Sequence, residues 1–358
     1  MVGSVLLGRM SACGDWRGLE PVFLSTSQVG AQAPSIGQAV APVGDAHDLA
    51  ALASLGVIVS CQGGDYTQRV HPALRAAGWQ GIWIDAASTL RMNDSAVIVL
   101  DPVNLERVEA AVARGVRDFI GGNCTVSLML MVLAGPIRQG WIEWISSMTY
   151  QAASGAGARH MQELVQQMRA IGGGAGELAT EPAASVLELD QRVRDVMASP
   201  DFPTSHFGAP LAASLIPWID SAVAGGQTRE EWKAGAEANK ILGLDPPLPI
   251  DGLCVRVGAM RCHSQGLTIK LKRAVPLDEV EACIRESNPW AKVIENTPEA
   301  TRRGLTPAAI SGSLDVAIGR LRTMKMGPDY LTAFTVGDQL LWGAAEPLRR
   351  MLQIALAS

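Results

Sequence analysis

The first third of the chain alternates short apolar runs with polar turns and helical patterns. The runs cover residues 21–24, 57–60, 82–84, 97–100 and 116–120. They are apolar throughout, as strands are when helices cover both faces of a sheet. Residues 66–77, closed by Gly78, have the pattern of a crossover helix. The alternation therefore predicts an α/β fold with a doubly wound parallel sheet.

The chain opens on a helical pattern, with apolar residues at positions 2, 5, 6 and 10. This spacing predicts a helix over residues 4–11. The strand that would precede this helix in a doubly wound sheet is central, so we expect a hydrophobic slot between its neighbours. Each buried unpaired backbone group costs about 1 to 3 kcal/mol. The chain from Met1 is therefore expected to be poorly soluble or inactive, and an upstream extension of about a dozen residues with a GxxG turn to restore it.

Beyond Cys124 the pattern changes to longer helices mixed with alternating strands, which predicts a second, α+β domain. The expected helices are 125–133, 157–168 and 185–197, and the expected strands are 253–259 and 267–271. Glycine-rich residues 172–176 and residues 245–249 are expected to be loops. Residues 337–356 are again helical in pattern, and we expect them to pack on the first domain. The predicted division is 1–122 with 340–358, against 123–339.

Composition excludes several classes of protein. The 358 residues carry a net charge of -5 without a block of like charge, which argues against nucleic acid and anionic membranes as partners. The longest apolar run, 126–134, is far shorter than the roughly 18 residues that span a bilayer. Residues 1–10 lack the basic start of a secretory signal, so we expect a cytoplasmic protein. The six cysteines form no CxxC pair, which predicts free thiols and no metal site.

The sharpest chemical signal is the segment GGNCT at residues 121–125, between a predicted strand and a predicted helix. It places the Cys124 thiol at a helix N-terminus, where the helix dipole and free N–H groups favour the nucleophilic thiolate. Gly121 and Gly122 are expected to give a substrate room to approach. The alternative interpretation is that Cys124 is a small buried hydrophobic residue.

A nucleophilic cysteine needs a proton-transfer partner, and sequence spacing alone cannot choose among His47, His71, His160, His206 and His263. His263 is the best candidate because it follows two arginines, Arg256 and Arg261, at the end of a predicted strand. The planar fork of an arginine binds carboxylates bidentately, so either arginine could hold an anionic substrate. A structural histidine and surface salt bridges are the alternatives.

Residues 25–27, Ser-Thr-Ser, end the first predicted strand of the parallel sheet. The corresponding segment of a dinucleotide-binding fold meets the adenosine ribose, and an acid there selects NAD. Hydroxyls without a carboxylate would accept a 2′-phosphate, which points to NADP. Gly3 could be the last glycine of a phosphate-binding turn.

Nine segments spread over the whole chain closely resemble the bacterial aspartate-semialdehyde dehydrogenase family. They are PVFLSTS at 21–27, SCQGGDYT at 60–67, WIDAASTLR at 83–91, GGNCTVS at 121–127, YQAASG at 150–155, EEWK at 230–233, CVRVG at 254–258, RCHSQ at 261–265 and VGDQLLWGAAEPLRR at 336–350. Their order is that of the family. The resemblance implies a Rossmann-like dinucleotide-binding domain, here without its first strand, and a catalytic and dimerisation domain.

The resemblance also implies a role for each matching residue. Cys124 would be the nucleophile that forms an acyl-thioester, and His263 the acid/base catalyst. The substrate would be bound by Gln151, Glu230 and Arg256, and its phosphate by Arg91, Lys233 and Asn123. The NADP contacts would be Gly3, Ser25, Thr26, Ser27, Gln62, Ser154, Gly155, Ala156, Gly157, Ala158, Pro182 and Gln339. Ala156 departs from the family pattern, which has a third consecutive glycine there.

The implied reaction is the NADPH-dependent reduction of L-4-aspartyl phosphate to L-aspartate 4-semialdehyde and phosphate. It would serve the biosynthesis of lysine, methionine, threonine and diaminopimelate, in a homodimer. Two alternatives remain open. One is a non-catalytic relative, shortened at its N-terminus, that acts as a structural or regulatory partner. The other is a sister N-acylglutamyl-phosphate reductase, against which Glu230 argues because an acetylated amine carries no charge to pair.

Overall fold

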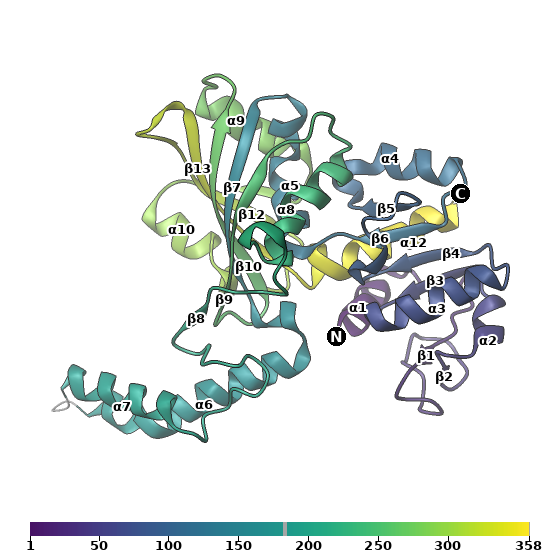
Figure 1. The fold of residues 1–358 in the computed structure, drawn as a ribbon, viewed down its shortest axis with the longest axis horizontal. Coiled ribbons are helices and arrows are strands. Elements are labelled where there is room, and N and C mark those ends of the chain that lie inside the picture. Colours follow the sequence, from purple (N-terminus) through teal and green to yellow (C-terminus); the bar gives the residue numbers. More distant parts are fainter. Residues whose placement is uncertain (182–184, 358) are drawn as a thin grey trace.

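The computed structural model describes residues 1–181 and 185–357. Its first part holds a four-stranded sheet in which all neighbouring strands are parallel (Figure 1). The strand order is β3 (Val57–Ser60), β4 (Ile82–Asp85), β6 (Asp118–Gly121) and β5 (Ala96–Val99). The predicted parallel sheet is confirmed for four of its five expected strands, whose ends differ from the expectation by no more than two residues. The fifth, expected at residues 21–24, is not part of this sheet.

Helices cover this sheet on both faces. They are α1 (Val2–Cys13), α2 (Leu49–Ala53), α3 (Gly64–Ala76), α4 (Asp101–Ala113) and α12 (Glu346–Ala357). The C-terminal helix α12 returns to the first part (Figure 1). There Leu348 and Met351 join Leu6 of α1 and Phe119 of β6 in one buried cluster. The expected packing of the C-terminus on the first part is therefore confirmed.

The predicted continuous helix over residues 337–356 is wrong in its first third. Strand β13 (Gly327–Asp338) extends to Asp338, and a π-helical turn, Leu341–Ala345, precedes α12. The run of apolar positions suits a helix, but the pairing of Gly337 with His263 on β10 (Cys262–Leu271) fixes these residues as strand.

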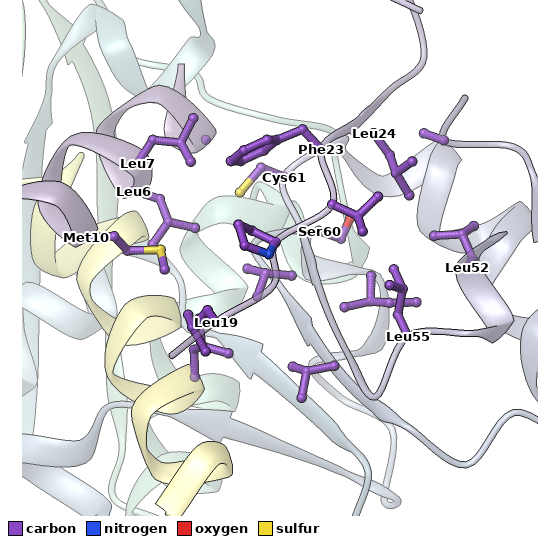
Figure 2. Close-up of a pocket in the computed structure, with 18 of the residues that line it drawn as sticks. Leu6, Leu7, Met10, Leu19, Phe23, Leu24, Leu52, Leu55, Ser60 and Cys61 are labelled. Atoms are coloured by element: carbon purple, nitrogen blue, oxygen red, sulfur yellow. The ribbon is translucent and has the colours of Figure 1, made fainter. Parts of the chain in front are cut away.

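The helix expected at the start of the chain is present as α1. Beside it, β1 (Leu24–Ser25) and β2 (Gly44–Asp45) form a separate two-stranded parallel sheet. Strand β3 pairs with β4 only, so within the described residues its other edge has no partner strand. An apolar cleft of about 530 Å³ lies between β3 and the segment that carries β1 (Figure 2). This cleft is the hydrophobic slot that the sequence predicts.

The second part is built on a seven-stranded mixed sheet, which confirms the predicted α+β organisation. Its order is β11 (Ala291–Val293), β12 (Val316–Met324), β13, β10, β7 (Ile142–Gln151), β9 (Ile250–Val257) and β8 (Leu215–Ile216). The large core joins this sheet to α5 (Cys124–Arg138), α8 (Arg229–Leu242) and α9 (Leu277–Ser287). Helices α10 (Pro298–Gly304) and α11 (Pro307–Ile310) precede β12.

Helices α6 (Ala158–Thr180) and α7 (Val186–Ala198) lie side by side and project from the body of the molecule (Figure 1). The predicted loop at residues 172–176 is wrong, because α6 continues through these glycines. A Cβ on Gly174 would lie 2.5 Å from the Val196 side chain, so this glycine allows α7 to approach. Residues 245–249 form the expected loop. None of the described helices has both the length and the hydropathy of a membrane span.

Candidate active site

Strand β6 leads directly into α5, and this junction places Cys124 at the first residue of the helix. Asn123 caps α5, because its Oδ1 accepts hydrogen bonds from the backbone N–H groups of Thr125 at 3.0 Å and Val126 at 3.2 Å. A Cβ on Gly343 would lie 2.7 Å from the Cβ of Cys124, so the π-helical turn packs directly against the cysteine. Cys124 is half-buried as a result.

The two glycines before the cysteine serve the protein's own packing. A Cβ on Gly121 would lie 3.2 Å from the Leu348 side chain, and one on Gly122 would lie 2.8 Å from the Ser127 hydroxyl. The expectation that they make room for a substrate is therefore wrong. They let the β6–α5 turn close against α12 and against the first turn of α5.

The structure brings His263 to Cys124, although 139 residues separate them in the chain. The Nε2 atom of His263 lies 3.1 Å from the Cys124 Sγ, and the histidine is 1% exposed. Its Nδ1 accepts a hydrogen bond of 3.0 Å from the backbone N–H of Ala152. In the neutral ring the proton must then be on Nε2, directed at the sulfur. The backbone of Ala152 therefore holds His263 in the orientation in which its Nε2–H can donate a proton at the Cys124 sulfur.

Both members of this pair are neutral in the ligand-free site. Burial, with a further contribution from the Glu230 carboxylate, raises the pKa of Cys124 to about 12. Burial, with the Arg256 charge, lowers the pKa of His263 to about 3. Desolvation of the sulfur thus opposes the thiolate that the helix dipole is expected to stabilise. The dipole offers only about half a positive charge, and desolvation of the sulfur outweighs it.

Alkylation of Cys124 by iodoacetamide should be slow at neutral pH and keep rising with alkalinity. Only the thiolate reacts, and a thiol with a pKa near 12 gains about tenfold in thiolate per pH unit between pH 7 and 10. Peptide mass spectrometry of Cys124 measures this rate, with exposed Cys13 as the internal control. A rate that levels off below pH 8 would show that the thiolate is already stabilised.

Arg256, on β9, is a buried cation. It is 7% exposed, and its Nη1 donates a hydrogen bond of 2.7 Å to the Ala152 carbonyl. Within the described ranges, no carboxylate forms an ion pair with it, whereas Arg261 pairs with Asp338 at 2.5 Å. The salt-bridge alternative therefore holds for Arg261 and fails for Arg256. Burial lowers the pKa of Arg256, and an unpaired buried charge is costly, so the site is suited to an anionic ligand.

Glu230, at the start of α8, joins three other predicted site residues. Its Oε1 accepts hydrogen bonds from Asn123 Nδ2 at 2.9 Å and Gln151 Nε2 at 3.2 Å, and its Oε2 lies 2.9 Å from Lys233 Nζ. Burial alone would raise the pKa of Glu230, but the Lys233 charge and these hydrogen bonds outweigh it and hold the pKa below its usual value. Glu230 is therefore a carboxylate.

Two carboxylates that sequence reasoning missed complete the cluster. Asp220 accepts a hydrogen bond of 2.8 Å from Lys233, and Glu237 pairs with Arg91 at 3.1 Å while accepting one from the Asn123 backbone N–H at 2.7 Å. The signal for Glu237 was available, because Glu230, Lys233 and Glu237 follow helical spacing on one face of α8. Asp220 lies in a loop, where spacing carries no such information.

The residues expected to contact NADP form two groups. At the first, Thr26 Oγ1 donates a 3.2 Å hydrogen bond to Gln62 Oε1, which joins the residues that follow β1 and β3. Ser25 Oγ accepts hydrogen bonds from the backbone N–H groups of Ser27 and Gln28. Gly3 lies in α1 against Cys61. This group offers hydroxyl and amide groups to the adenosine end of a dinucleotide.

The second group adjoins His263. Gln339 Nε2 donates a 2.7 Å hydrogen bond to Ser154 Oγ, and a Cβ on Gly155 would lie 3.1 Å from the His263 ring. Gly157 has a φ of +109°, whereas Ala156 avoids positive φ and is accommodated without strain, with Ala158 beginning α6. Pro182 lies outside the described residues. This cradle beside the reactive pair fits the redox end of the same dinucleotide, so the two groups together fit NADP.

Residues 1–111 match the semialdehyde dehydrogenase NAD binding domain, and residues 134–342 match the semialdehyde dehydrogenase dimerisation domain. An aspartate semialdehyde dehydrogenase from Francisella tularensis is 46% identical, with 99% of this chain and 96% of that chain covered and a TM-score of 0.95. Aspartate semialdehyde dehydrogenase II from Vibrio cholerae, solved with ASA, is 22% identical over 100% and 95%, with a TM-score of 0.76. The Candida albicans enzyme solved with NADP is 16% identical over 99% and 95%, with a TM-score of 0.64. The last two likenesses concern the fold alone.

Proposed function

This chain belongs to the semialdehyde dehydrogenase family, and from that premise we propose that it reduces L-4-aspartyl phosphate to L-aspartate 4-semialdehyde and phosphate with NADPH. The observation that supports this best is the Cys124–His263 pair, 3.1 Å apart, beside the buried unpaired Arg256. A nucleophile, a proton donor and a carboxylate clamp are the groups that the reaction requires. The product supplies lysine, methionine and threonine biosynthesis.

Substrate binding uses both anion-binding groups of the site. Arg256 binds the α-carboxylate, and Glu230 faces the α-amino group while Gln151 orients the acyl carbon beside the sulfur. Lys233 and Arg91 bind the phosphate, and Asn123 is the third residue that contacts it. Each cation except Arg256 already has a carboxylate partner, so the phosphate shares Lys233 with Asp220 and Glu230, and Arg91 with Glu237.

In the acylation step the Cys124 sulfur attacks the acyl carbon, the C–O bond to phosphate breaks, and a thioester forms. The thiol proton leaves with the phosphate, because the Nε2 atom of His263 already carries a proton. When bound, NADPH supplies the hydride that reduces the thioester. His263 donates its Nε2 proton to the sulfur as the C–S bond breaks, which releases the semialdehyde and restores the thiol, and a proton taken up from solvent returns the ring to its neutral form.

The cofactor site uses Ser25, Thr26, Ser27, Gln62 and Gly3 for the adenosine and phosphate end. Ser154, residues 155–158 and Gln339 hold the redox end, together with the predicted contact Pro182. The proposed division of the chain is a cofactor-binding part, residues 1–122 and 340–358, and a catalytic part, residues 123–339, which also contributes the contacts to the redox end of the cofactor. A cytoplasmic location belongs to the same proposal, since Cys124 must remain reduced.

NADP should be preferred over NAD, because Thr26 and its serine neighbours offer hydroxyls to a 2′-phosphate. Thr26→Asp places a carboxylate against that phosphate, and we expect kcat/KM for NADPH to fall about tenfold to a hundredfold. Steady-state kinetics with both cofactors measure the change, and Thr26→Ser, which keeps the hydroxyl, is the control. Equal kcat/KM values for NADH and NADPH in the unmodified protein would contradict this assignment.

The family match supports a homodimer, and we place its contact on the open face of the seven-stranded sheet. Large hydrophobic side chains are exposed there on neighbouring strands, Met148 and Tyr150 on β7 and Leu253 on β9. Leu253→Lys should shift the protein toward monomer in sedimentation velocity, whereas Met326→Lys, in the β12–β13 turn, should not. If Leu253→Lys remained a dimer, the dimer contact would have to lie on another surface of the protein.

The proposed activity is tested by phosphate-dependent reduction of NADP with L-aspartate 4-semialdehyde. N-acetylglutamate semialdehyde should give no turnover, because its acetylated amine carries no charge to pair with Glu230. Calorimetry with NADPH separates an enzyme from a non-catalytic relative. NADPH binding without turnover of either aldehyde would overturn the proposed function.

A further inference from the structure

A row of buried polar side chains runs from the candidate active site into the core beside α5. His263 and Gln265 stand two residues apart on β10, so their side chains share one face of the sheet. They are 1% and 2% exposed. Farther along the strand the same face is apolar, with Leu267 and Ile269. A buried amide is costly unless it is hydrogen-bonded, so the partners of Gln265 indicate why it stands at this position.

Gln265 bonds the first turn of the helix that carries Cys124. Its Nε2 donates a hydrogen bond of 2.9 Å to the backbone carbonyl of Thr125, the residue that follows Cys124. Apart from the contact between Cys124 and His263, no other side-chain hydrogen bond joins β10 to α5 within residues 1–181 and 185–357. Gln265 is therefore the side chain that fixes β10 against the start of α5.

Ser147, on the neighbouring strand β7, determines which way the Gln265 amide points. Its Oγ donates a hydrogen bond of 2.9 Å to Gln265 Oε1, and Ser147 is only 5% exposed. Because the amide oxygen already accepts this bond, the amide nitrogen faces the Thr125 carbonyl. Both ends of the amide are thus used to join α5 to the sheet.

The two members of the reactive pair are held by different parts of the fold. The His263 ring is fixed by the Ala152 N–H, just beyond the end of β7, whereas Cys124 belongs to the first turn of α5. The 3.1 Å separation of the Cys124 Sγ and the His263 Nε2 therefore depends on where α5 begins relative to β7 and β10. Gln265 bonds α5 and β7 from β10, so it sets this spacing.

We propose that Gln265 is a positioning residue, which holds the first turn of α5 on β10 so that the Cys124 sulfur stays beside the His263 ring. Ser147 assists it by orienting the amide. The effect of Gln265 on turnover rests on the proposed function, whereas its effect on the distance between the sulfur and the ring does not.

Gln265→Met keeps the length of the side chain and removes both hydrogen bonds. We expect kcat with L-aspartate 4-semialdehyde to fall about tenfold to a hundredfold, because a displacement of about 1 Å at a reacting group can cost that much. KM for NADP should stay near that of the unmodified protein. Crystal structures of the two proteins without ligands should show the distance from the Cys124 sulfur to His263 Nε2 lengthened by roughly 0.5 to 1 Å in the variant.

Gln265→Glu tests the hydrogen bond itself in a side chain of the same shape. A protonated carboxyl group can donate to the Thr125 carbonyl and an ionised one cannot, and burial raises the pKa of a carboxyl group. The ratio of its kcat to that of the unmodified protein should therefore fall between about pH 6 and about pH 9, as the carboxyl group loses its proton. A role in packing alone would give a constant ratio, which would overturn the proposal.

Thr335→Val is the matched control. Thr335 lies opposite Gln265 on β13 and is 1% exposed, so this variant removes a polar group of similar burial that has no hydrogen bond to α5 in the described chain. It should lower Tm at most, and leave kcat unchanged. Native kcat or an unchanged distance between the sulfur and the ring in Gln265→Met would overturn the proposal, as would an equal loss of kcat in Thr335→Val. If the unmodified protein does not turn over the aldehyde, the proposed function fails, and the crystallographic distances alone decide the role of Gln265.

Discussion

Cys124→Ala is expected to lower kcat/KM for phosphate-dependent oxidation of L-aspartate 4-semialdehyde by at least about 10⁴-fold. The reason is that Cys124 alone among the cysteines combines a helix N-terminus with a histidine proton donor, at 3.1 Å from its sulfur. Without the thiol no thioester forms, and the remaining groups can only bind the aldehyde. NADPH affinity, measured by calorimetry, should stay near that of the unmodified protein.

Single alanine variants of Cys61, Cys254, Cys262 and Cys283 are the controls for this prediction. Cys254 and Cys262 are buried, so their replacement should cost stability through lost packing while turnover persists. Thermal melting separates that loss from a loss of chemistry. If Cys124→Ala were active and a variant at another of these cysteines were inactive, that other cysteine would be the nucleophile.

Arg256→Lys is expected to cost about 2 to 5 kcal/mol in kcat/KM, which is the range for breaking a buried charge pair. The Arg256 fork can bond the Ala152 carbonyl through Nη1 and still present further N–H groups to a carboxylate. A lysine ammonium is a single point charge and cannot reproduce that geometry. Kinetics with the semialdehyde measure the loss, and NADPH affinity should barely change.

The matched control is Arg261→Lys, because Arg261 lies two residues before His263 in the chain but is paired with Asp338. We expect this variant to keep kcat/KM within a few-fold of the unmodified protein. If Arg256→Lys kept native kcat/KM, its role would be structural, through the Ala152 carbonyl alone.

The sequence predicted the parallel sheet well because strands buried on both faces are continuous apolar runs, as at β3 and β4. It failed where tertiary contacts override local signals. Gly174 is tolerated inside α6 because α7 packs against it, and Gly337 is held in β13 by its pairing with His263. Neither partner can be identified from neighbouring residues.

The residues of the site could be predicted from the sequence only where neighbouring residues carry a signal, because their distances and protonation depend on tertiary contacts. Local context at residues 121–125 and 256–263 pointed to Cys124, to His263 and to either Arg256 or Arg261, but only the fold shows that the cysteine and the histidine meet. The protonation of the pair could not be predicted, because it depends on how fully the protein excludes water from the sulfur and the ring. The N–H of Ala152, which fixes the His263 ring, is a backbone group that leaves no trace in a sequence.

In the proposed mechanism Cys124 carries the acyl group, and that group can be trapped on its sulfur. The protein is incubated with L-aspartate 4-semialdehyde and NADP in the absence of phosphate, quenched in acid and digested for mass spectrometry. We predict one aspartyl group on the peptide that contains Cys124, removed when phosphate is added before quenching and absent from Cys124→Ala. An aspartyl group on another cysteine, or turnover with no acyl group on any cysteine, would contradict the account.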